Sequence, residues 1–191
     1  MKDKILKLAQ QQMKAGGYEN LSFAKIADDL STTRANVHHH FRNKEGLALQ
    51  ATQKYIDETS QNMLSLFEKN KGNFVGFLCD MEGFFLNQVK ESGRQGSCVC
   101  GQLVREPNTP DSILKLAQSH FDTFKIFLET MIKESQENGL INKTIAPPVL
   151  STLTMSIILG LNQLAMVHGD NPEFLTEIKG TLTKFVSAYK K

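Results

Sequence analysis

Three consecutive histidines, His38, His39 and His40, form the densest group of reactive side chains in the sequence. Consecutive positions on a helix point about 100° apart, so three histidines in a row cannot converge on one metal ion. Helical metal pairs need spacings of three or four residues. The serines, histidines and carboxylates match no hydrolase or kinase arrangement, and the motifs GxGxxG and GxxxxGK[ST] are absent. We therefore predict no enzyme activity, no metal and no cofactor, and expect His40 to be turned partly inward.

Polar side chains surround the histidines on a short predicted helix, from Arg34 to about His40. Val37 and Phe41, four residues apart, give this helix a narrow buried side. Its other sides then present groups that can hydrogen-bond to base edges in a DNA groove. The residues expected to read bases are Arg34, Asn36 and His38.

A second short helix is predicted just before this one, because apolar residues recur there at i, i+3, i+4 and i+7: Phe23, Ile26, Ala27 and Leu30. Ser22 is the candidate N-cap of this helix, and Thr33 can cap the next. Two short helices joined by the tight turn at residues 31–33 predict a helix-turn-helix. The side chains expected to hold DNA phosphates are Ser22, Thr33, His39 and Lys44.

Charge is distributed unevenly along the chain. Residues 1–50 contain eight Lys and Arg against five Asp and Glu, whereas residues 51–191 contain fourteen against fifteen. Lys44 begins a long predicted helix, where free backbone N–H groups and the helix dipole already favour an anion. The basic excess therefore lies in the segment that is expected to meet the phosphates.

Several motifs in this segment carry a resemblance to a known family: Gly17-Tyr18, Leu21-Ser22, Ile26-Ala27 and the run from His39 to Leu47. They resemble the N-terminal domain of the TetR family of one-component transcriptional regulators. Ser31 stands where the turn usually carries Gly, and His38 stands where the recognition helix usually carries Tyr. The resemblance implies a DNA-binding domain at residues 1–45, a helical ligand-binding and dimerisation domain at 46–191, a DNA operator and a small-molecule effector.

Beyond residue 50, every periodic segment is helical, so the sequence predicts an all-α chain of about nine helices. The ninth is expected to open at Pro172 and to continue to Tyr189 without interruption. The Phe- and Met-rich stripes can form plain core, or they can enclose the ligand pocket that the resemblance implies. The residues proposed for that pocket are Phe77, Met81, Phe84, Cys98, Cys100, Phe121, Phe124 and Ile158.

Three cysteines, an odd number, argue against a disulfide scaffold and fit a reducing cytoplasm. Cys98 and Cys100 lack the spacing and the second pair that a zinc site needs. They are either buried packing residues or a redox or electrophile sensor, whose thiol pKa Arg94 and Arg105 could lower. Cys79 lies in a Phe-rich helix and is expected in the core.

Residues 144–169 carry no charge, yet their Pro, Ser, Thr, Asn and Gln residues argue against a lipid-facing span. The helix predicted from Pro147 to His168 is apolar on nearly every side, which requires cover on all sides. We therefore expect a two-fold dimer through the eighth and ninth helices. The residues expected at its interface are Leu153, Ile157, Leu161, Leu164, Phe174, Ile178, Leu182 and Phe185.

Taken with these patterns, the resemblance to the TetR family implies a homodimeric, cytoplasmic repressor that leaves a palindromic operator when a small molecule, such as an electrophile or oxidant, binds. One alternative is a small-molecule-binding or thiol-reactive sensor with little specific DNA binding. A second is a DNA-organising protein without sequence specificity. Binding to DNA at several salt concentrations separates the three, because specific affinity exceeds nonspecific affinity by about 10³ to 10⁷.

Overall fold

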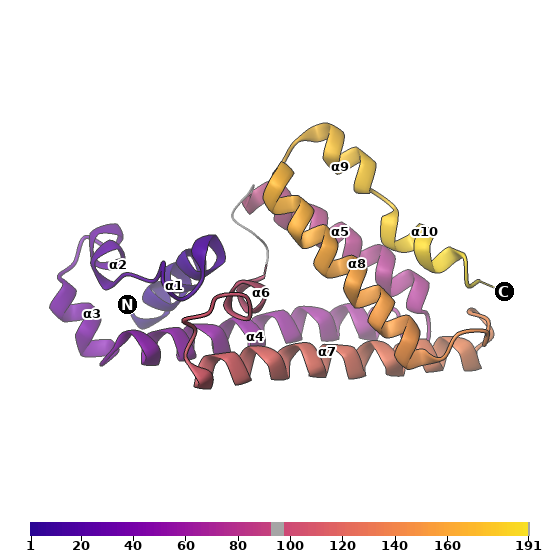
Figure 1. Ribbon diagram of the computed structural model, residues 1–191, viewed down its shortest axis with the longest axis horizontal. Helices are drawn as coiled ribbons and strands as arrows, with labels where there is room; N and C mark the ends of the chain where they lie inside the picture. Colours follow the sequence, from indigo (N-terminus) through magenta and orange to yellow (C-terminus); the bar gives the residue numbers. More distant parts are fainter. Residues whose placement is uncertain (93–97, 191) are drawn as a thin grey trace. The chain divides into compact units, whose positions relative to one another are not determined.

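A computed structural model describes residues 1–92 and 98–190, and within these residues the chain is helical (Figure 1). The helices are α1 (Lys2–Gly16), α2 (Phe23–Asp29), α3 (Arg34–His40), α4 (Lys44–Lys69), α5 (Phe74–Ser92), α6 (Val99–Leu103), α7 (Asp111–Glu137), α8 (Pro147–His168), α9 (Pro172–Ile178) and α10 (Thr181–Ser187). The only β pairing among the described residues is one isolated bridge between Ile141 and Lys190. The predicted all-α class is confirmed.

The contacts divide the chain into two compact units. Unit 1 comprises residues 1–59 and 98–120, and unit 2 comprises residues 60–97 and 121–191. Helices α4 and α7 each contribute residues to both units. These units are defined by packing, so the functional boundary that we expect after residue 45 stays a prediction.

In unit 1 the short helices start where their capping residues predict. The Ser22 hydroxyl accepts a hydrogen bond from the Lys25 N–H at 3.4 Å, and the Thr33 hydroxyl accepts one from the Asn36 N–H at 3.2 Å. The Asn43 side chain caps α4 by accepting from the Gly46 N–H at 2.7 Å. Each cap satisfies a backbone donor that the first helical turn leaves free.

The segment that follows α6 is tied to the connection between α1 and α2, although the two are far apart in sequence. The Glu106 carboxylate accepts hydrogen bonds from the backbone N–H groups of Tyr18 and Glu19, the latter at 2.7 Å. Gly17 lies at φ +69°, and a Cβ there would collide with that carboxylate. Glycine is therefore required at this position both by the backbone and by the space available.

Unit 2 has its own hydrophobic core, to which α5 contributes a stripe of buried side chains: Phe74, Phe77, Leu78 and Met81. Cys79 follows Leu78 directly and is exposed, so our prediction that it lies in the core was wrong. The physical reason is helical rotation, because neighbouring residues point about 100° apart and Leu78 takes the inward position.

The predicted ninth helix consists of two short helices, α9 and α10, with Gly180 between them at φ +84°. The Glu82 carboxylate, whose side chain is buried, accepts hydrogen bonds from the N–H groups of Gly180 at 2.8 Å and Leu182 at 3.0 Å. A buried carboxylate needs such donors. It therefore stabilises the interruption that periodicity alone did not indicate.

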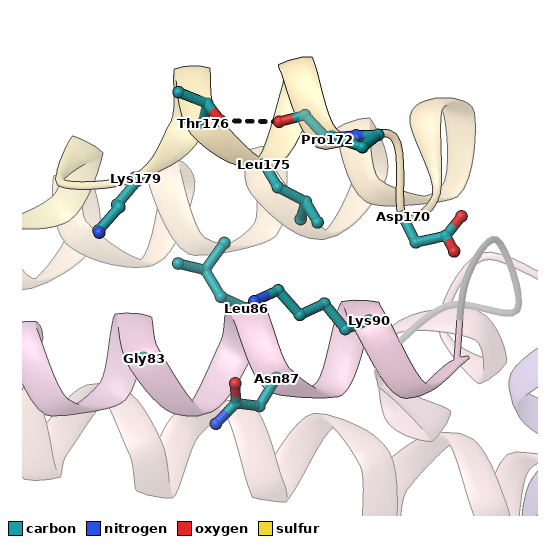
Figure 2. A pocket seen from close by; sticks show the side chains of 9 residues that line it. All are labelled: Gly83, Leu86, Asn87, Lys90, Asp170, Pro172, Leu175, Thr176 and Lys179. Carbon is teal, nitrogen blue, oxygen red and sulfur yellow. Dashed lines mark hydrogen bonds between the residues drawn. The ribbon is translucent and has the colours of Figure 1, made fainter.

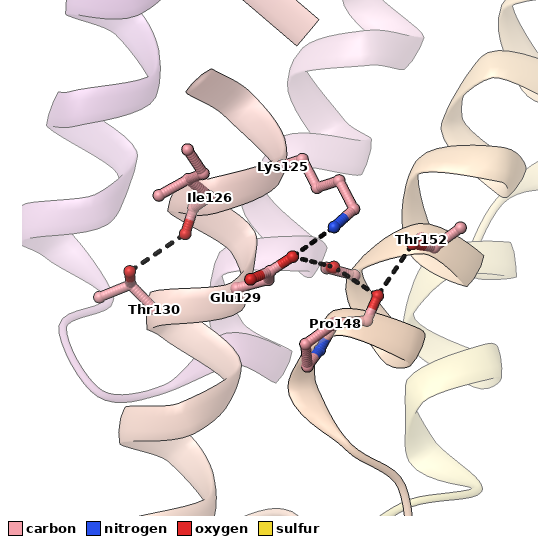
Figure 3. A network of polar contacts seen from close by, with 7 residues as sticks. Lys125, Ile126, Glu129, Thr130, Pro148 and Thr152 are labelled. Carbon is pink, nitrogen blue, oxygen red and sulfur yellow. Dashed lines mark hydrogen bonds and ion pairs between the residues drawn. The ribbon is translucent and has the colours of Figure 1, made fainter. Parts of the chain in front are cut away.

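Helix α8 packs against α7 through a polar network (Figure 3). Glu129 accepts from Lys125 at 2.5 Å and from the Ser151 hydroxyl at 3.4 Å, and Ser151 and Thr152 both donate to the Pro148 carbonyl. By length and composition α8 could cross a membrane, and little of its most apolar stretch is buried within the single chain. The single chain therefore leaves much of the apolar surface of α8 exposed.

Candidate nucleic-acid interface and effector sites

Helices α2 and α3 and the turn between them form the candidate DNA-binding element. Ser31 in this turn has φ +49°, the only positive φ of a non-glycine residue among the described residues. This is the left-handed conformation, which glycine adopts at least cost. Val37 is fully buried and anchors α3 from beneath. The turn and the anchor leave Arg34, His38 and His39 of α3 facing solvent.

Most of the residues expected to contact DNA lie on that exposed surface. Arg34, His38, His39 and the capping residue Thr33 are exposed, whereas Ser22 is half-buried. The His38 ring stacks on Phe23 of α2, with ring centroids 4.3 Å apart and planes 21° apart. This stack fixes the direction of the His38 ring, so that its nitrogens have a defined position on the α3 surface.

Asn36 differs from the other predicted base-reading residues, because it is half-buried and its side-chain amide donates to the Thr32 hydroxyl at 2.9 Å. The amide therefore helps to hold the turn against α3. Ala35, which we did not predict, is exposed beside Arg34. A small apolar side chain at such a position can contact a thymine methyl group. Sequence reasoning that selected only polar residues could not find it.

Lys44 lies at the start of α4 and is held on the α1–α2 connection. Its ammonium donates to the Glu19 carbonyl at 3.1 Å, lies 3.7 Å from the Glu19 carboxylate, and sits 4.7 Å from the centre of the Tyr18 ring. Burial, followed by nearby carboxylates, raises the pKa of the Tyr18 hydroxyl, which stays a protonated hydrogen-bond donor. The Lys44 ammonium and the Tyr18 ring therefore lie side by side at the start of α4.

The residues expected at a dimer interface differ in exposure, and two of them, Ile157 and Phe185, are half-buried. Leu161, Phe174, Ile178 and Leu182 are buried in the core of unit 2 and cannot reach a partner without leaving it. Leu153 and Leu164 are exposed, and so are Val149, Leu159 and Val167, which we did not select. Sequence periodicity did not separate these groups, because α8 is apolar on nearly all sides.

The residues proposed for a ligand pocket likewise divide between different environments. Phe77 and Met81 are core residues of unit 2, Phe84, Phe124 and Ile158 are half-buried there, and Phe121 is also half-buried. A separate cleft of about 610 Å³ lies between α5 and α9 (Figure 2). Leu86 and Leu175 face each other across it, and Lys90 and Lys179 line it. None of the proposed pocket residues lines this cleft.

Cys98 and Cys100 lie in unit 1, at the start of α6. Cys98 is half-buried, and its sulfur caps the helix by accepting from the Gly101 N–H at 3.3 Å. Cys100 is fully buried, and burial raises the pKa of its thiol far above the ordinary value. Arg105 donates to the Gly101 carbonyl and to the Gln102 side chain. Arg94, the other predicted partner, lies outside the described residues.

Comparison with known proteins gives a consistent result for the N-terminal segment. Residues 5–51 match the family described as bacterial regulatory proteins, tetR family. None of the curated proteins compared with the chain matches it.

Solved structures match over the full length of the chain. A TetR-family regulator from Agrobacterium tumefaciens is 23% identical with a TM-score of 0.87, and the match covers 100% of this chain and 97% of that one. The regulatory protein TetR from Rhodobacter sphaeroides is 17% identical with a TM-score of 0.84, covering 95% and 96%. A regulator from Saccharomonospora viridis, solved in complex with choline, is 20% identical with a TM-score of 0.78, covering 97% and 95%.

At these identities the solved structures establish the fold, whereas the family match covers the helix-turn-helix itself. The match includes both short helices, their caps and the start of α4. The capped helix-turn-helix, the matched segment and the full-length fold agree with one another: residues 5–51 are similar to the tetR family of bacterial regulatory proteins, and the fold is similar to that of solved TetR-family regulators.

Proposed function

We propose that the protein is a homodimeric, cytoplasmic repressor that binds a palindromic operator through α3 and leaves it when a small molecule, such as an electrophile or oxidant, is bound. The observation that carries the proposal is the exposed surface of α3, which is capped by Thr33 and anchored by the buried Val37. Its outward side chains can hydrogen-bond to bases, and a helix of this length fits the major groove.

Within this surface, Arg34 and His38 are proposed to read base edges, and Ala35 is proposed to contact a thymine methyl group. Thr33, His39, Ser22 and the paired Lys44 and Tyr18 are proposed to hold phosphates. Asn36 is also proposed to read a base, for which its side-chain amide must first break its hydrogen bond to the Thr32 hydroxyl. Phosphate contacts fix the position of the helix, whereas base contacts determine the sequence that is bound.

Dimerisation is proposed through the exposed side of α8. Six exposed residues follow one another at spacings of three or four along this helix: Val149, Leu153, Ser156, Gly160, Leu164 and Val167. Such spacing places them on one continuous stripe. A Cβ at Gly160 would meet nothing within 4 Å, so the middle of the stripe is open to a closely approaching helix. A second copy of α8 would cover this stripe, since two-fold interfaces are self-complementary.

The dimer also satisfies a requirement of DNA recognition. A single recognition helix of seven residues contacts few base pairs. Two such helices, centred about 34–36 Å apart, match successive major grooves on one side of DNA, which makes the bound site palindromic. A second copy of α8 packed on this stripe would also explain why so apolar a helix occurs in a protein that we propose to be cytoplasmic.

Two regions are proposed to receive a signal. The cleft between α5 and α9 combines apolar walls at Leu86 and Leu175 with ammonium groups at Lys90 and Lys179 (Figure 2), and its volume suits a small organic ligand. The thiol of Cys98 is the second region. The complex of one similar structure with choline is consistent with small-molecule control in proteins of this fold.

The first experiment selects bound fragments from genomic DNA and measures affinity for the selected site and for a scrambled site between 50 and 200 mM salt. We expect a specific affinity about 10³-fold or more above the nonspecific one. A sedimentation experiment at micromolar concentration should show a dimer. Equal affinity for both DNAs would instead favour a DNA-organising protein, and no complex would favour a sensor without specific DNA binding.

A further inference from the structure

Side chains of three other helices surround the thiol of Cys98 in unit 1. Lys14 belongs to α1, Tyr55 to α4 and His120 to α7. The Lys14 ammonium lies 5.5 Å from the centre of the Tyr55 ring, and the Tyr55 and His120 rings meet edge to face at 6.4 Å. The Tyr55 hydroxyl is hydrogen-bonded to the Cys98 sulfur and to the Thr59 side chain.

The protonation of these neighbours makes them hydrogen-bond donors. Burial, followed by the interaction with Cys98, raises the pKa of Tyr55 well above its ordinary value, so its hydroxyl keeps its proton. Burial lowers the pKa of Lys14, while the nearby Cys98 and Glu58 act in the opposite direction. Burial also lowers the pKa of His120, which favours the neutral ring. The group thus offers a phenol and an ammonium beside one accessible sulfur.

A third hydroxyl in the same region lacks a partner. Thr52 precedes Tyr55 by three residues and therefore lies on the same side of α4. Its side chain is fully buried, and its hydroxyl has no hydrogen-bond partner among the described residues. Buried hydroxyls are normally satisfied, so an orphaned one beside Tyr55 indicates unused hydrogen-bonding capacity there.

The three cysteines differ in their surroundings. Cys100 is fully buried with its thiol held protonated, so it is a poor nucleophile. Cys79 is exposed on α5 and belongs to unit 2, whereas Lys14, Tyr55 and Cys98 belong to unit 1. Cys98 alone combines access to solvent with the neighbouring phenol and ammonium.

We propose that Cys98 is a covalent sensor for α,β-unsaturated carbonyl compounds, in which Lys14 and Tyr55 position and activate the electrophile. The reaction is an addition. The sulfur forms a bond to the β-carbon, the π electrons of the double bond move to the carbonyl oxygen, and the proton lost by the thiol returns through solvent to the α-carbon. No group leaves, and no oxidant or reductant is consumed. The Lys14 ammonium and the Tyr55 hydroxyl stabilise the negative charge on the carbonyl oxygen.

The consequence for DNA binding follows from the position of Cys98, and this step rests on the proposed repressor function. The sulfur is the N-cap of α6, and an alkyl group on it weakens its hydrogen bond to the Gly101 N–H. Helix α6 packs on α1, and Glu106 just beyond it holds the Tyr18 and Glu19 backbone. Displacing α6 therefore disturbs the connection on which α2 and Lys44 rest.

The test compares two reagents on the purified full-length protein. Methyl vinyl ketone develops an oxyanion as the thiol adds to it, whereas iodoacetamide alkylates by displacement of iodide. Peptide mass spectrometry measures both rates at each cysteine. We expect the ratio of ketone rate to iodoacetamide rate to be about tenfold higher at Cys98 than at Cys79, because Lys14 and Tyr55 beside Cys98 stabilise the oxyanion that forms only with the ketone.

Two variants isolate those donors. Tyr55→Phe keeps the ring and removes the hydroxyl, and Lys14→Gln removes the charge. Each should lower the rate ratio at Cys98 by about tenfold and leave the ratio at Cys79 unchanged. Equal ratios at the two cysteines in the wild type, or unchanged ratios in both variants, would overturn the assignment of the site. Because these rates are measured without DNA, they decide it even if the proposed repressor function fails.

The regulatory consequence is measured as operator affinity after treatment with methyl vinyl ketone. Wild type and Cys79→Ser should lose about tenfold or more in affinity, whereas Cys98→Ser should keep it, because serine preserves the cap of α6. Full modification of Cys98 with unchanged affinity would overturn the sensor. An unmodified protein without specific DNA binding would overturn the proposed repressor function and, with it, the regulatory consequence.

Discussion

The outward sides of α3 and α8 are both uncovered in a single copy of the chain, yet they differ in chemistry. The α3 surface presents Arg34, His38 and His39, which water solvates well. The α8 surface presents Val149, Leu153, Leu164 and Val167, with Val167 62% exposed. Exposed apolar area costs about 25 cal/mol per Å², whereas solvated polar side chains cost little. We infer that α8 is covered permanently by a partner, while α3 can bind and release DNA reversibly.

The largest effect is expected from placing a charge on the exposed stripe of α8. Leu164→Asp should prevent dimerisation, since the carboxylate would be buried without a partner. Operator affinity should fall by about 10³ or more although α3 is untouched. Sedimentation and fluorescence anisotropy measure the two effects. Thr130→Asp, at an exposed position of α7, is the matched control and should change neither. A Leu164→Asp dimer with full affinity would place the interface elsewhere.

A change on the polar surface should act on DNA alone. Arg34→Ala should cost about 1–3 kcal/mol on the best operator and relax the preference at one base position, while the protein stays dimeric. Asn36→Ala provides an internal comparison, because the Asn36 amide is held by Thr32. We expect its cost to be smaller. A uniform loss on all sequences for Arg34→Ala would reassign this residue to phosphate binding.

The phosphate-binding part of the polar surface should respond differently. Lys44→Ala should weaken binding to every sequence and lower the slope of log affinity against log salt by about 1. Lys44→Arg keeps the charge and serves as the control. Titrating a selected and a scrambled site across salt concentrations measures both slopes. If only the selected site is affected, Lys44 contributes to base readout instead.

The smallest effect is expected from the turn that supports α3. Ser31 adopts a left-handed conformation at φ +49°, which costs a non-glycine residue about 1–2 kcal/mol. Glycine removes this strain but loses about 0.5–1 kcal/mol through greater freedom when unfolded. Ser31→Gly should therefore stabilise the protein by about 0.5–1 kcal/mol without changing operator affinity. Urea unfolding measures this shift, and Ser31→Val should move it in the opposite direction.

Much of the helix-turn-helix could be predicted from sequence because its determinants are local. Ser22 and Thr33 cap the helices that the sequence assigned to them, since an N-cap acts on backbone groups two or three residues away. The left-handed turn at Ser31 follows from equally short-range geometry.

The candidate sites could be predicted only in part, because they depend on which side of a helix is covered. Leu161 and Leu164 are both apolar and only three residues apart, yet one is in the core and the other is exposed. Cys79 is exposed although neighbouring residues of α5 are part of the core. The side-chain amide of Asn36 is hydrogen-bonded to Thr32. Periodicity identifies an apolar side only when a helix also has a polar one.

The sequence by itself determined the all-α class, the start of each helix of the helix-turn-helix and the excess of basic residues within residues 1–50. The tertiary structure decided which residues separated in sequence meet. It placed the Glu82 carboxylate on the N–H groups at the start of α10 and so divided the last predicted helix. It also brought Lys14 from α1 and Tyr55 from α4 to Cys98. The reason is that caps and turns depend on neighbouring residues, whereas these contacts depend on how whole helices pack.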